Sequence, residues 1–203
     1  MISRKKVGII IIIIGILLVA YPIYLKIRSN AEQKKLINKF EDKKTEIKET
    51  KDDIESANSI KYNSWPDTLM KIPKIDLEVM VVEMEASDID VFAADVNYPP
   101  AHYRTTSFPG YKDNVGIAGH RTGPADYFRH INKLEKGDKI ILETQKGTHE
   151  YIVERVFIVD PWDNSVIKST PYGALTLTSC ERADGISNKK RIIVRAVLKG
   201  SLK

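Results

Sequence analysis

The stretch Thr176-Leu177-Thr178-Ser179-Cys180 lies near the C-terminal end of the sequence and contains the only cysteine among 203 residues. Residues 173–178 alternate leucines with small and β-branched residues, which predicts a strand. A polar segment follows, and residues 191–198 predict a second strand. Cys180 is therefore expected at a strand end where a loop begins, a position that suits a nucleophile. Because a lone cysteine is more often a small buried hydrophobic residue, the rest of the chain must decide its role.

The N-terminal region predicts a membrane-spanning helix. Residues 7–25 carry no charge, and a helix of this length spans about 28 Å, close to the hydrocarbon thickness of a bilayer. We place the transmembrane helix at residues 7–27. Basic residues flank it on both sides, so the positive-inside rule only slightly favours a cytoplasmic tail over residues 1–6. A signal peptide is the alternative, but the run is long for one and no small-residue cleavage site follows it.

Export and charge narrow the possible roles of Cys180. A single cysteine in an exported chain has no intramolecular disulfide partner, so it either pairs between molecules or stays a free reactive thiol. The net charge of +5 is not gathered into a basic patch, so we expect no nucleic-acid partner. The sequence also contains no Gly-rich phosphate loop and no Cys/His pair with metal-binding spacing.

The segment 28–61 predicts a charged helical stalk. Between residues 29 and 59, seven lysines face eight acidic residues, and neither Pro nor Gly occurs. Apolar residues recur mostly at heptad spacing, at Ile37, Phe40, Ile47 and Ile54. This seam is typical of a weak coiled coil, but Lys44 and Lys51 interrupt it, so the pattern fits a lone solvated helix at least as well. We expect the stalk to hold the following domain off the membrane.

Residues 62–203 predict one mainly β domain. Strands are expected at 70–82 with a break at Pro73, and at 114–119, 139–144, 148–159, 173–178 and 191–198. Short helices are expected at 87–94 and at 124–134, the second burying Phe128, Ile131 and Leu134. Many short strands with few helices indicate a small barrel or sandwich.

A thiol needs a neighbouring base or cation to react, and His120 is the best candidate base among the four histidines. It ends an apolar strand and follows Gly119, as Cys180 ends its own strand. We expect the other three to be structural (His102), on the surface (His130), or solvated or cross-strand (His149).

An acyl-transfer site also needs a positive charge for the developing oxyanion. Arg191 begins the strand that returns from the Cys180 loop, so an antiparallel pair would bring it near the thiol. Arg182 and Arg195 are alternatives, and each of these arginines could instead be a solvated surface residue.

Three segments in this order resemble the sortase family of Gram-positive cell-surface transpeptidases. TLTSC at 176–180 is similar to the family's TLxTC, with Ser179 in place of threonine. VGIAGHRTG at 115–123 resembles its GH motif, and KKRIIVRAVL at 189–198 resembles the strand that carries its arginine. The resemblance extends over about residues 69–198 and implies an eight-stranded sortase β-barrel.

The resemblance also implies a mechanism. Cys180 would attack the Thr–Gly bond of an LPxTG-like sorting signal, His120 would act as acid and base, and Arg191 would stabilise the oxyanion. A thioester on Cys180 would then pass to an amine of a peptidoglycan precursor or another acceptor, with no metal or organic cofactor required. Lys190 or Arg195 could take the place of Arg191. Thr178, Ser179, Pro161 and Trp162 are the expected substrate contacts, the last two in a loop over 160–172 that borders the groove.

The motifs resemble class D or class E enzymes more than class B, and we expect protein anchoring to the cell wall rather than pilin polymerisation. The expected location is the cell membrane, with a cytoplasmic N-terminus and the catalytic domain outside. Two rivals stay open. One is a Cys/His peptidoglycan hydrolase or L,D-transpeptidase, whose motif usually places His and Gly just before the cysteine. The other is a membrane-tethered binding module in which Cys180 is buried and inert.

Overall fold

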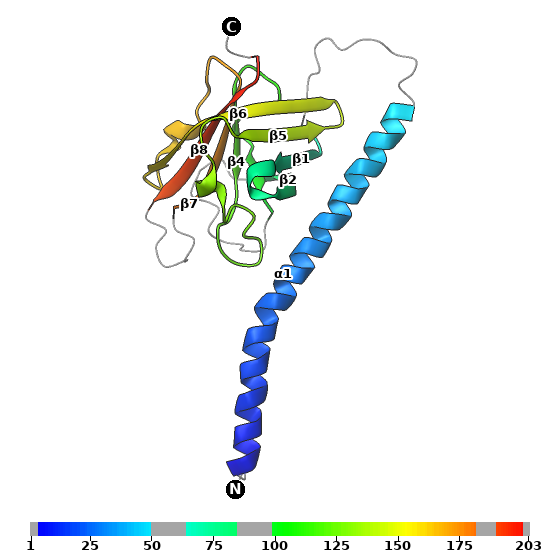
Figure 1. Cartoon of the computed structure of the whole chain (residues 1–203), viewed down its shortest axis with the longest axis vertical. Helices are drawn as coiled ribbons and strands as arrows, with labels where there is room; N and C mark the ends of the chain where they lie inside the picture. The colour runs from blue at the N-terminus through cyan, green and yellow to red at the C-terminus, as the bar shows by residue number, and fades with distance from the viewer. Residues whose placement is uncertain (1–3, 50–63, 85–98, 182–189, 201–203) are drawn as a thin grey trace.

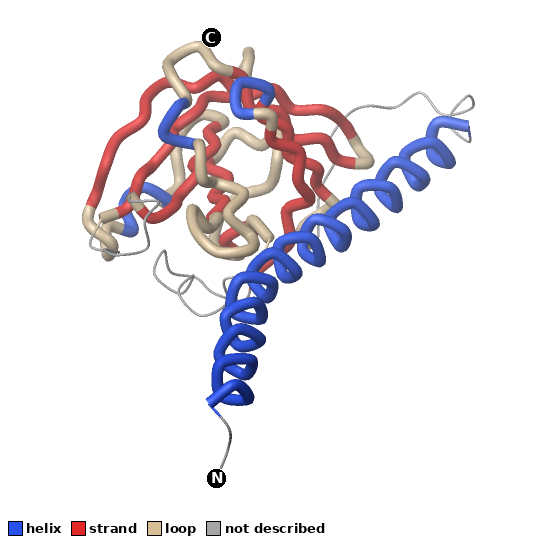
Figure 2. The backbone as a smooth tube through the Cα atoms, turned by 60° about the horizontal axis from the view of Figure 1, so that its bottom comes forward, coloured by secondary structure: helices blue, strands red, loops and turns tan. Residues whose placement is uncertain are grey.

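The computed structural model describes residues 4–49, 64–84, 99–181 and 190–200. A long helix, α1 (Arg4–Glu49), precedes a closed barrel whose strands follow the order β1-β2-β3-β4-β7-β8-β6-β5. The strands are β1 (Thr68–Ile72), β2 (Leu77–Met84), β3 (Ala101–Tyr103), β4 (Asn114–Ala118), β5 (Lys139–Thr144), β6 (Gly147–Val159), β7 (Ala174–Cys180) and β8 (Arg191–Leu198). The described residues also form the 3₁₀ turns η2 (Pro73–Ile75), η4 (Ile131–Lys133) and η5 (Asn164–Ile167). Figure 2 shows the ring of strands with α1 alongside it.

Two parallel pairings, β2 with β3 and β4 with β7, interrupt an otherwise antiparallel barrel. The predicted strands at 139–144 and 191–198 are confirmed with the same bounds. The predicted break at Pro73 is also confirmed, because η2 separates β1 from β2 and Asp76 turns the chain with φ 50°. The three-residue strand β3 was not predicted, since it is too short to show an alternating pattern.

The α-helix expected at 124–134 is wrong. Its apolar residues Phe128, Ile131 and Leu134 are buried as predicted, but the only helical turn in this described segment is the 3₁₀ turn η4. The backbone N–H of Phe128 donates to the carbonyl of His120 at 2.9 Å, instead of to a residue one helical turn earlier. The segment therefore folds back on the end of β4. The helix expected at 87–94 lies outside the described residues.

Two apolar layers line the two faces of the β4-β7-β8 sheet. The barrel interior is filled by a large cluster that includes Val115, Ile117, Leu175, Leu177 and Val194. A smaller cluster on the outer face joins Ala118 and Ile193 to Val166 and Ile167 of η5. Because side chains alternate between faces along a strand, the even-numbered residues of β7, Cys180 among them, face this outer cluster.

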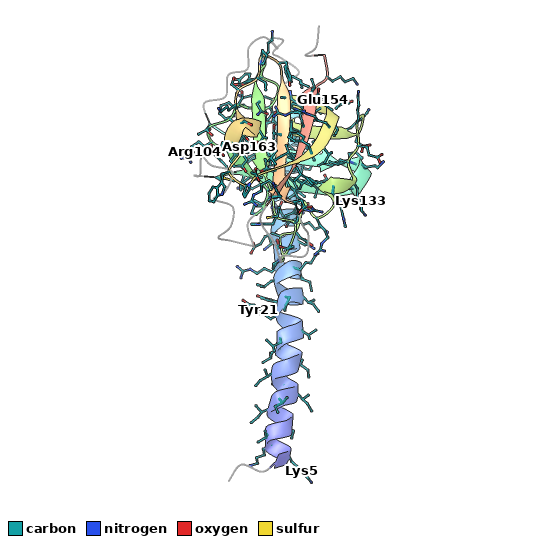
Figure 3. All side chains as sticks on the ribbon, turned by 90° about the vertical axis from the view of Figure 1, so that its left-hand side faces the viewer. Lys5, Tyr21, Arg104, Lys133, Glu154 and Asp163 are labelled. Atoms are coloured by element: carbon teal, nitrogen blue, oxygen red, sulfur yellow. The ribbon has the colours of Figure 1, made fainter. Side chains whose placement is uncertain are left out.

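The helix α1 is continuous through the expected transmembrane and stalk segments. Its apolar residues up to Tyr24 are exposed, and Figures 1 and 3 show this half extending away from the barrel, with Lys5 and Tyr21 labelled in Figure 3. It is long and apolar enough to span a membrane. Further along, Phe40 is 1% exposed and packs against Leu69 and Met80 of the barrel. The described part of the stalk is therefore not a lone solvated helix, and its apolar seam contacts the barrel.

Candidate active site

Cys180 and Arg191 lie directly opposite each other on neighbouring antiparallel strands. Cys180 is the last residue of β7 and Arg191 the first residue of β8, and the register pairs them. Directly paired side chains share a face, with Cβ atoms about 5 Å apart. The Cys180 side chain is half-buried, whereas Arg191 is 7% exposed. A largely buried arginine side chain thus leaves the sheet beside the thiol.

His120 follows the end of β4, which runs parallel to β7. Ala118 pairs with Thr178, and the N–H of Gly119 donates to the Thr178 carbonyl at 3.1 Å. His120 therefore lies just beyond the paired end of β4, at the same end of the barrel as Cys180. Because β4, β7 and β8 are neighbours in the barrel, His120, Cys180 and Arg191 lie at three adjacent strand ends, and we call this arrangement the row.

Gly119 is packed tightly from two sides, which fixes the backbone next to His120. The Ser179 hydroxyl donates to the Gly119 carbonyl, and the Phe128 ring lies over the Gly119 Cα. A Cβ atom at position 119 would lie 2.5 Å from the Phe128 ring. Only glycine permits this approach. The small neighbour that favoured His120 in the sequence is therefore required for packing against Phe128.

Thr178 and Ser179, both expected to contact substrate, are almost fully buried and point to opposite faces. The Thr178 hydroxyl shares a 2.7 Å hydrogen bond with the Tyr103 hydroxyl, on the same face as Cys180. The Ser179 hydroxyl binds Gly119 in the interior of the barrel. Both hydroxyls are therefore engaged within the protein, and this placement favours positioning of the strand end over contact with a ligand.

Arg121, which the sequence analysis did not single out, fastens the strand end that carries the thiol. Its side chain is 6% exposed and donates to the main-chain carbonyl oxygens of Cys180, at 3.3 Å, and of Glu181. The same guanidinium donates to the Arg129 carbonyl and, at 2.8 Å, to the Asn132 side chain. Burial lowers the pKa of Arg121, although the charges of Glu181 and Cys180 oppose this effect. One cation therefore joins the loop after His120 to the end of β7.

Of the other basic candidates, Arg195 and Lys190 make contacts elsewhere. Arg195 pairs with Thr176, four residues along β8 from Arg191, which is about 13 Å along the strand. Its guanidinium donates to the Val166 carbonyl at 2.7 Å, so it holds η5 against the sheet. Lys190 is exposed and its ammonium lies 2.6 Å from Asp160. Arg182 lies outside the described residues.

The loop between β6 and β7 covers the face on which Cys180 lies. Val166 and Ile167 of η5 pack against this face, and the Asn114 side chain donates to the carbonyls of Val166 and Lys168. Trp162 precedes η5 and is 74% exposed, with Pro161 half-buried beside it. A large exposed indole next to an ordered turn is available for contact with a ligand.

A sequence model of the sortase domain matches residues 70–199, more than half of the chain. This protein belongs to the sortase family. Sortases are cysteine transpeptidases, and Cys180 is the single cysteine of this one. The match begins in β1 and ends just after β8, so it covers the barrel and the whole row of candidate residues.

The sortase resembles relatives of more than one class. It is 27% identical to sortase SrtE1 of Streptomyces coelicolor over 95% of this chain, although the match spans 56% of that protein's length. It is also 27% identical to sortase A of Listeria monocytogenes, over 88% of this chain and 85% of that protein. The structure of a Clostridium perfringens sortase D5 transpeptidase superposes with a TM-score of 0.60, 28% identity and coverage of 83% of this chain and 98% of that one.

Two residues of the site escaped the sequence analysis for different reasons. Arg121 directly follows His120, and its adjacency to a candidate base was a usable signal. Tyr103 gave no such signal, because the hydrogen bond to Thr178 joins residues 75 positions apart. Only the strand order of the barrel brings these two hydroxyls together.

Proposed function

We propose that this sortase cleaves an LPxTG-like sorting signal between Thr and Gly and transfers the resulting acyl group to an amine acceptor of the cell wall. The observation that supports this most directly is the row of His120, Cys180 and Arg191 across β4, β7 and β8. Acyl transfer by a thiol needs a nucleophile, a proton donor and an oxyanion partner, and these three residue types supply them.

In the first step, the Cys180 thiolate attacks the threonine carbonyl carbon and a tetrahedral oxyanion forms. Arg191 carries the charge that stabilises this oxyanion, since its side chain leaves the sheet on the same face as the thiol. The carbon–nitrogen bond then breaks, and protonated His120 gives its proton to the departing glycine amine. The products are a thioester on Cys180 and a free glycine-led peptide.

In the second step, an amine of the acceptor attacks the thioester carbonyl. His120 accepts a proton from the amine, the carbon–sulfur bond breaks, and the Cys180 thiolate is restored. The acceptor is a peptidoglycan precursor or a similar amine. Trp162 and Pro161, in the loop above this face, contact the sorting signal. No step needs a metal or an organic cofactor.

The membrane topology is part of the same proposal. The helix α1 anchors the chain by its apolar half, residues 1–6 lie in the cytoplasm, and the barrel lies on the outer surface. The bounds 1–6, 7–27, 28–61 and 62–203 for the tail, membrane span, stalk and catalytic domain belong to this proposal as well. Protease added to intact cells tests the topology, because it should remove an epitope tag at the C-terminus and spare one at the N-terminus.

The activity is tested with the full chain in nanodiscs and fluorogenic peptides of LPxTG type beside scrambled peptides. We expect cleavage of the LPxTG-type peptides alone, product joined to an added amine, and no turnover by Cys180→Ala or His120→Ala. His130→Ala is the matched control, because this exposed histidine lies in the same loop. Joining of a pilin lysine in preference to a cell-wall amine would instead make the enzyme a pilin polymerase. Turnover of muropeptides but not of sorting peptides would overturn the proposal.

A further inference from the structure

One face of α1 contacts the barrel along much of the helix beyond the apolar half. Six residues three or four positions apart make these contacts, and we call them the docking face: Lys26, Ser29, Gln33, Ile37, Phe40 and Lys44. This spacing places all six on one side of an α-helix. The lysine at position 44 belongs to the face, because its ammonium lies 2.6 Å from the Glu143 carboxylate.

The middle of the docking face covers an open edge of β2. Among the described residues, the parallel strand β3 pairs with residues 82–84 of β2, and no other strand pairs with the earlier part of β2 on that side. The Gln33 side chain accepts a buried 2.9 Å hydrogen bond from the Met80 N–H, and Phe40 packs beside it. A buried donor without this partner would cost about 1–3 kcal/mol, so the contact is specific.

The lower end of the docking face contacts the loop that follows His120. The Lys26 ammonium lies 3.0 Å from the Asp126 carboxylate, and the Ser29 and Tyr127 hydroxyls are 2.8 Å apart. Burial of Asp126 opposes its ionisation, but Arg129 and Lys26 lower its pKa. Phe128, two residues after Asp126, donates its backbone N–H to the His120 carbonyl. Figure 1 shows this loop, in green, at the end of the barrel nearer the N-terminus of α1.

These contacts fix the height of the site above a membrane. Lys26 is the first charged residue after the apolar run 7–25, so it lies where the hydrocarbon layer ends. A free stalk over residues 26–49 could lift a domain by about 36 Å. The docking face instead folds the barrel back along the helix, so the loop bearing Asp126 and Tyr127 lies at the level of Lys26 and Ser29.

We propose that the docking face holds the His120 end of the barrel against the lipid headgroup layer, so that this end works on peptides presented at the membrane surface. The partner of this end is the bilayer surface, and α1 acts as a clamp of fixed length. The part that concerns peptides rests on the proposed function. The position of the barrel does not, because it follows from the contacts of α1 alone.

The position is measured by fluorescence quenching in nanodiscs whose lipids carry a nitroxide on the headgroup. Cys180→Ser removes the only cysteine, so single labels can be placed by His130→Cys in the loop or Lys146→Cys at the β5–β6 turn. We expect strong quenching at 130 and weak quenching at 146, which lies near the Lys44 end of the docking face, about 27 Å further along α1. Equal quenching at both positions would overturn the proposal.

The role of the docking face is tested in the same labelled proteins by Phe40→Asp. Leu36→Asp is the matched control, since Leu36 lies on the same helix, is 41% exposed and is not part of the face. We expect Phe40→Asp to abolish the difference between the two labels and Leu36→Asp to preserve it. An unchanged difference in Phe40→Asp would contradict the proposal, provided that circular dichroism shows a folded barrel in both variants.

A seven-residue polar helical insertion between Leu25 and Lys26 separates the two proposals. It raises the docked barrel by about 10 Å without changing a contact of the docking face. In the labelled Cys180→Ser form we expect weaker quenching at 130. With Cys180 intact, the same insertion should leave cleavage of a soluble peptide unchanged and slow cleavage of the same peptide anchored in the bilayer. If no peptide is cut by any form, the proposed function fails while the quenching result still decides the position. Unchanged quenching would overturn the clamp.

Discussion

The guanidinium of Arg121 donates to the main-chain carbonyl of Cys180, so the residue after the candidate base holds the residue that carries the thiol. The same guanidinium also donates to Arg129 and Asn132, which lie in the loop that folds back on His120. Because the guanidinium is nearly fully buried, its charge acts on the thiol region with little screening by water. Arg121 is thus a positioning residue for both halves of the site.

Replacing Arg121 by methionine should lower kcat much more than it raises KM. The substitution removes the tie between β7 and the His120 loop and a positive charge near the thiolate, and neither change touches the substrate. Alkylation of Cys180 by iodoacetamide at fixed pH should slow as well. Arg121→Lys should restore part of the alkylation rate, because it keeps the charge but cannot form the same set of bonds.

Arg195→Met is the control for Arg121, since it removes an equally buried guanidinium that binds a carbonyl away from the thiol. Both variants should lose stability. If Arg195→Met slows the alkylation of Cys180 as much as Arg121→Met does, the effect is a general loss of structure and the positioning role is wrong.

Substitution of Arg191 should lower activity far more than substitution of an arginine away from the site. Loss of an oxyanion donor typically lowers kcat by about 10²–10³, and we expect a fall of this size for Arg191→Ala. Arg191→Lys should recover little, because an ammonium cannot reproduce a planar fork of donors. The exposed Arg155 on β6 offers a control, and Arg155→Ala should leave peptide cleavage near its original rate. Comparable losses in both alanine variants would remove Arg191 from the mechanism.

Gly119→Ala should disturb the His120 loop through a steric contact. The new Cβ would lie 2.5 Å from the Phe128 ring, so the ring or the β4–β7 ladder must move. Overpacking of this kind costs about 1–3 kcal/mol of the free energy of unfolding. The double variant Gly119→Ala/Phe128→Leu should recover part of the lost stability in a thermal melt. If the double variant is no more stable than the single one, Phe128 is not the cause.

His102 should make the barrel less stable in acid. Burial, opposed by hydrogen bonds to Ser107 and Thr106, lowers the pKa of His102 from 6.5 to about 4. The Nε2–H donates to the Ser107 carbonyl at 2.9 Å, while Nδ1 is buried without a hydrogen-bond partner among the described residues. The folded state therefore holds this ring neutral, and the unfolded chain protonates it first.

As pH falls from 6.5 to about 4, the unfolded state takes up the proton and the folded state does not, so the free energy of unfolding should fall. The loss approaches about 3 kcal/mol at pH 4, and above pH 6.5 the full stability is present. Urea unfolding of the full chain in detergent, at a series of pH values, measures this slope. His102→Phe keeps a ring to stack on Trp65, whose centroid lies 3.9 Å away. It should flatten the slope, and equal slopes in both proteins would exclude His102 as the cause.

Local sequence patterns predicted much of the barrel, but they could not predict the contacts between segments that are distant in the sequence. The alternation in 191–198 and the turn at Pro73 are local, so β8 and the β1–β2 break followed from the sequence. The apolar seam of α1 was seen, but whether it met another helix or a sheet depends on the open edge of β2. The buried pattern at 124–134 fitted a helix, because periodicity cannot show that the Phe128 N–H would bind His120.

The position of β7 between β4 and β8 determines when the active site can form during synthesis of the chain. The thiol strand is paired with β4, made some 60 residues earlier, and with β8, which is made after it. Contacts of such long sequence separation form late in folding, because the loop between them must first be closed. A nascent or truncated chain that lacks β8 therefore carries a cysteine without its arginine and without one side of its strand. Activity is withheld until β8 has been made and has paired with β7.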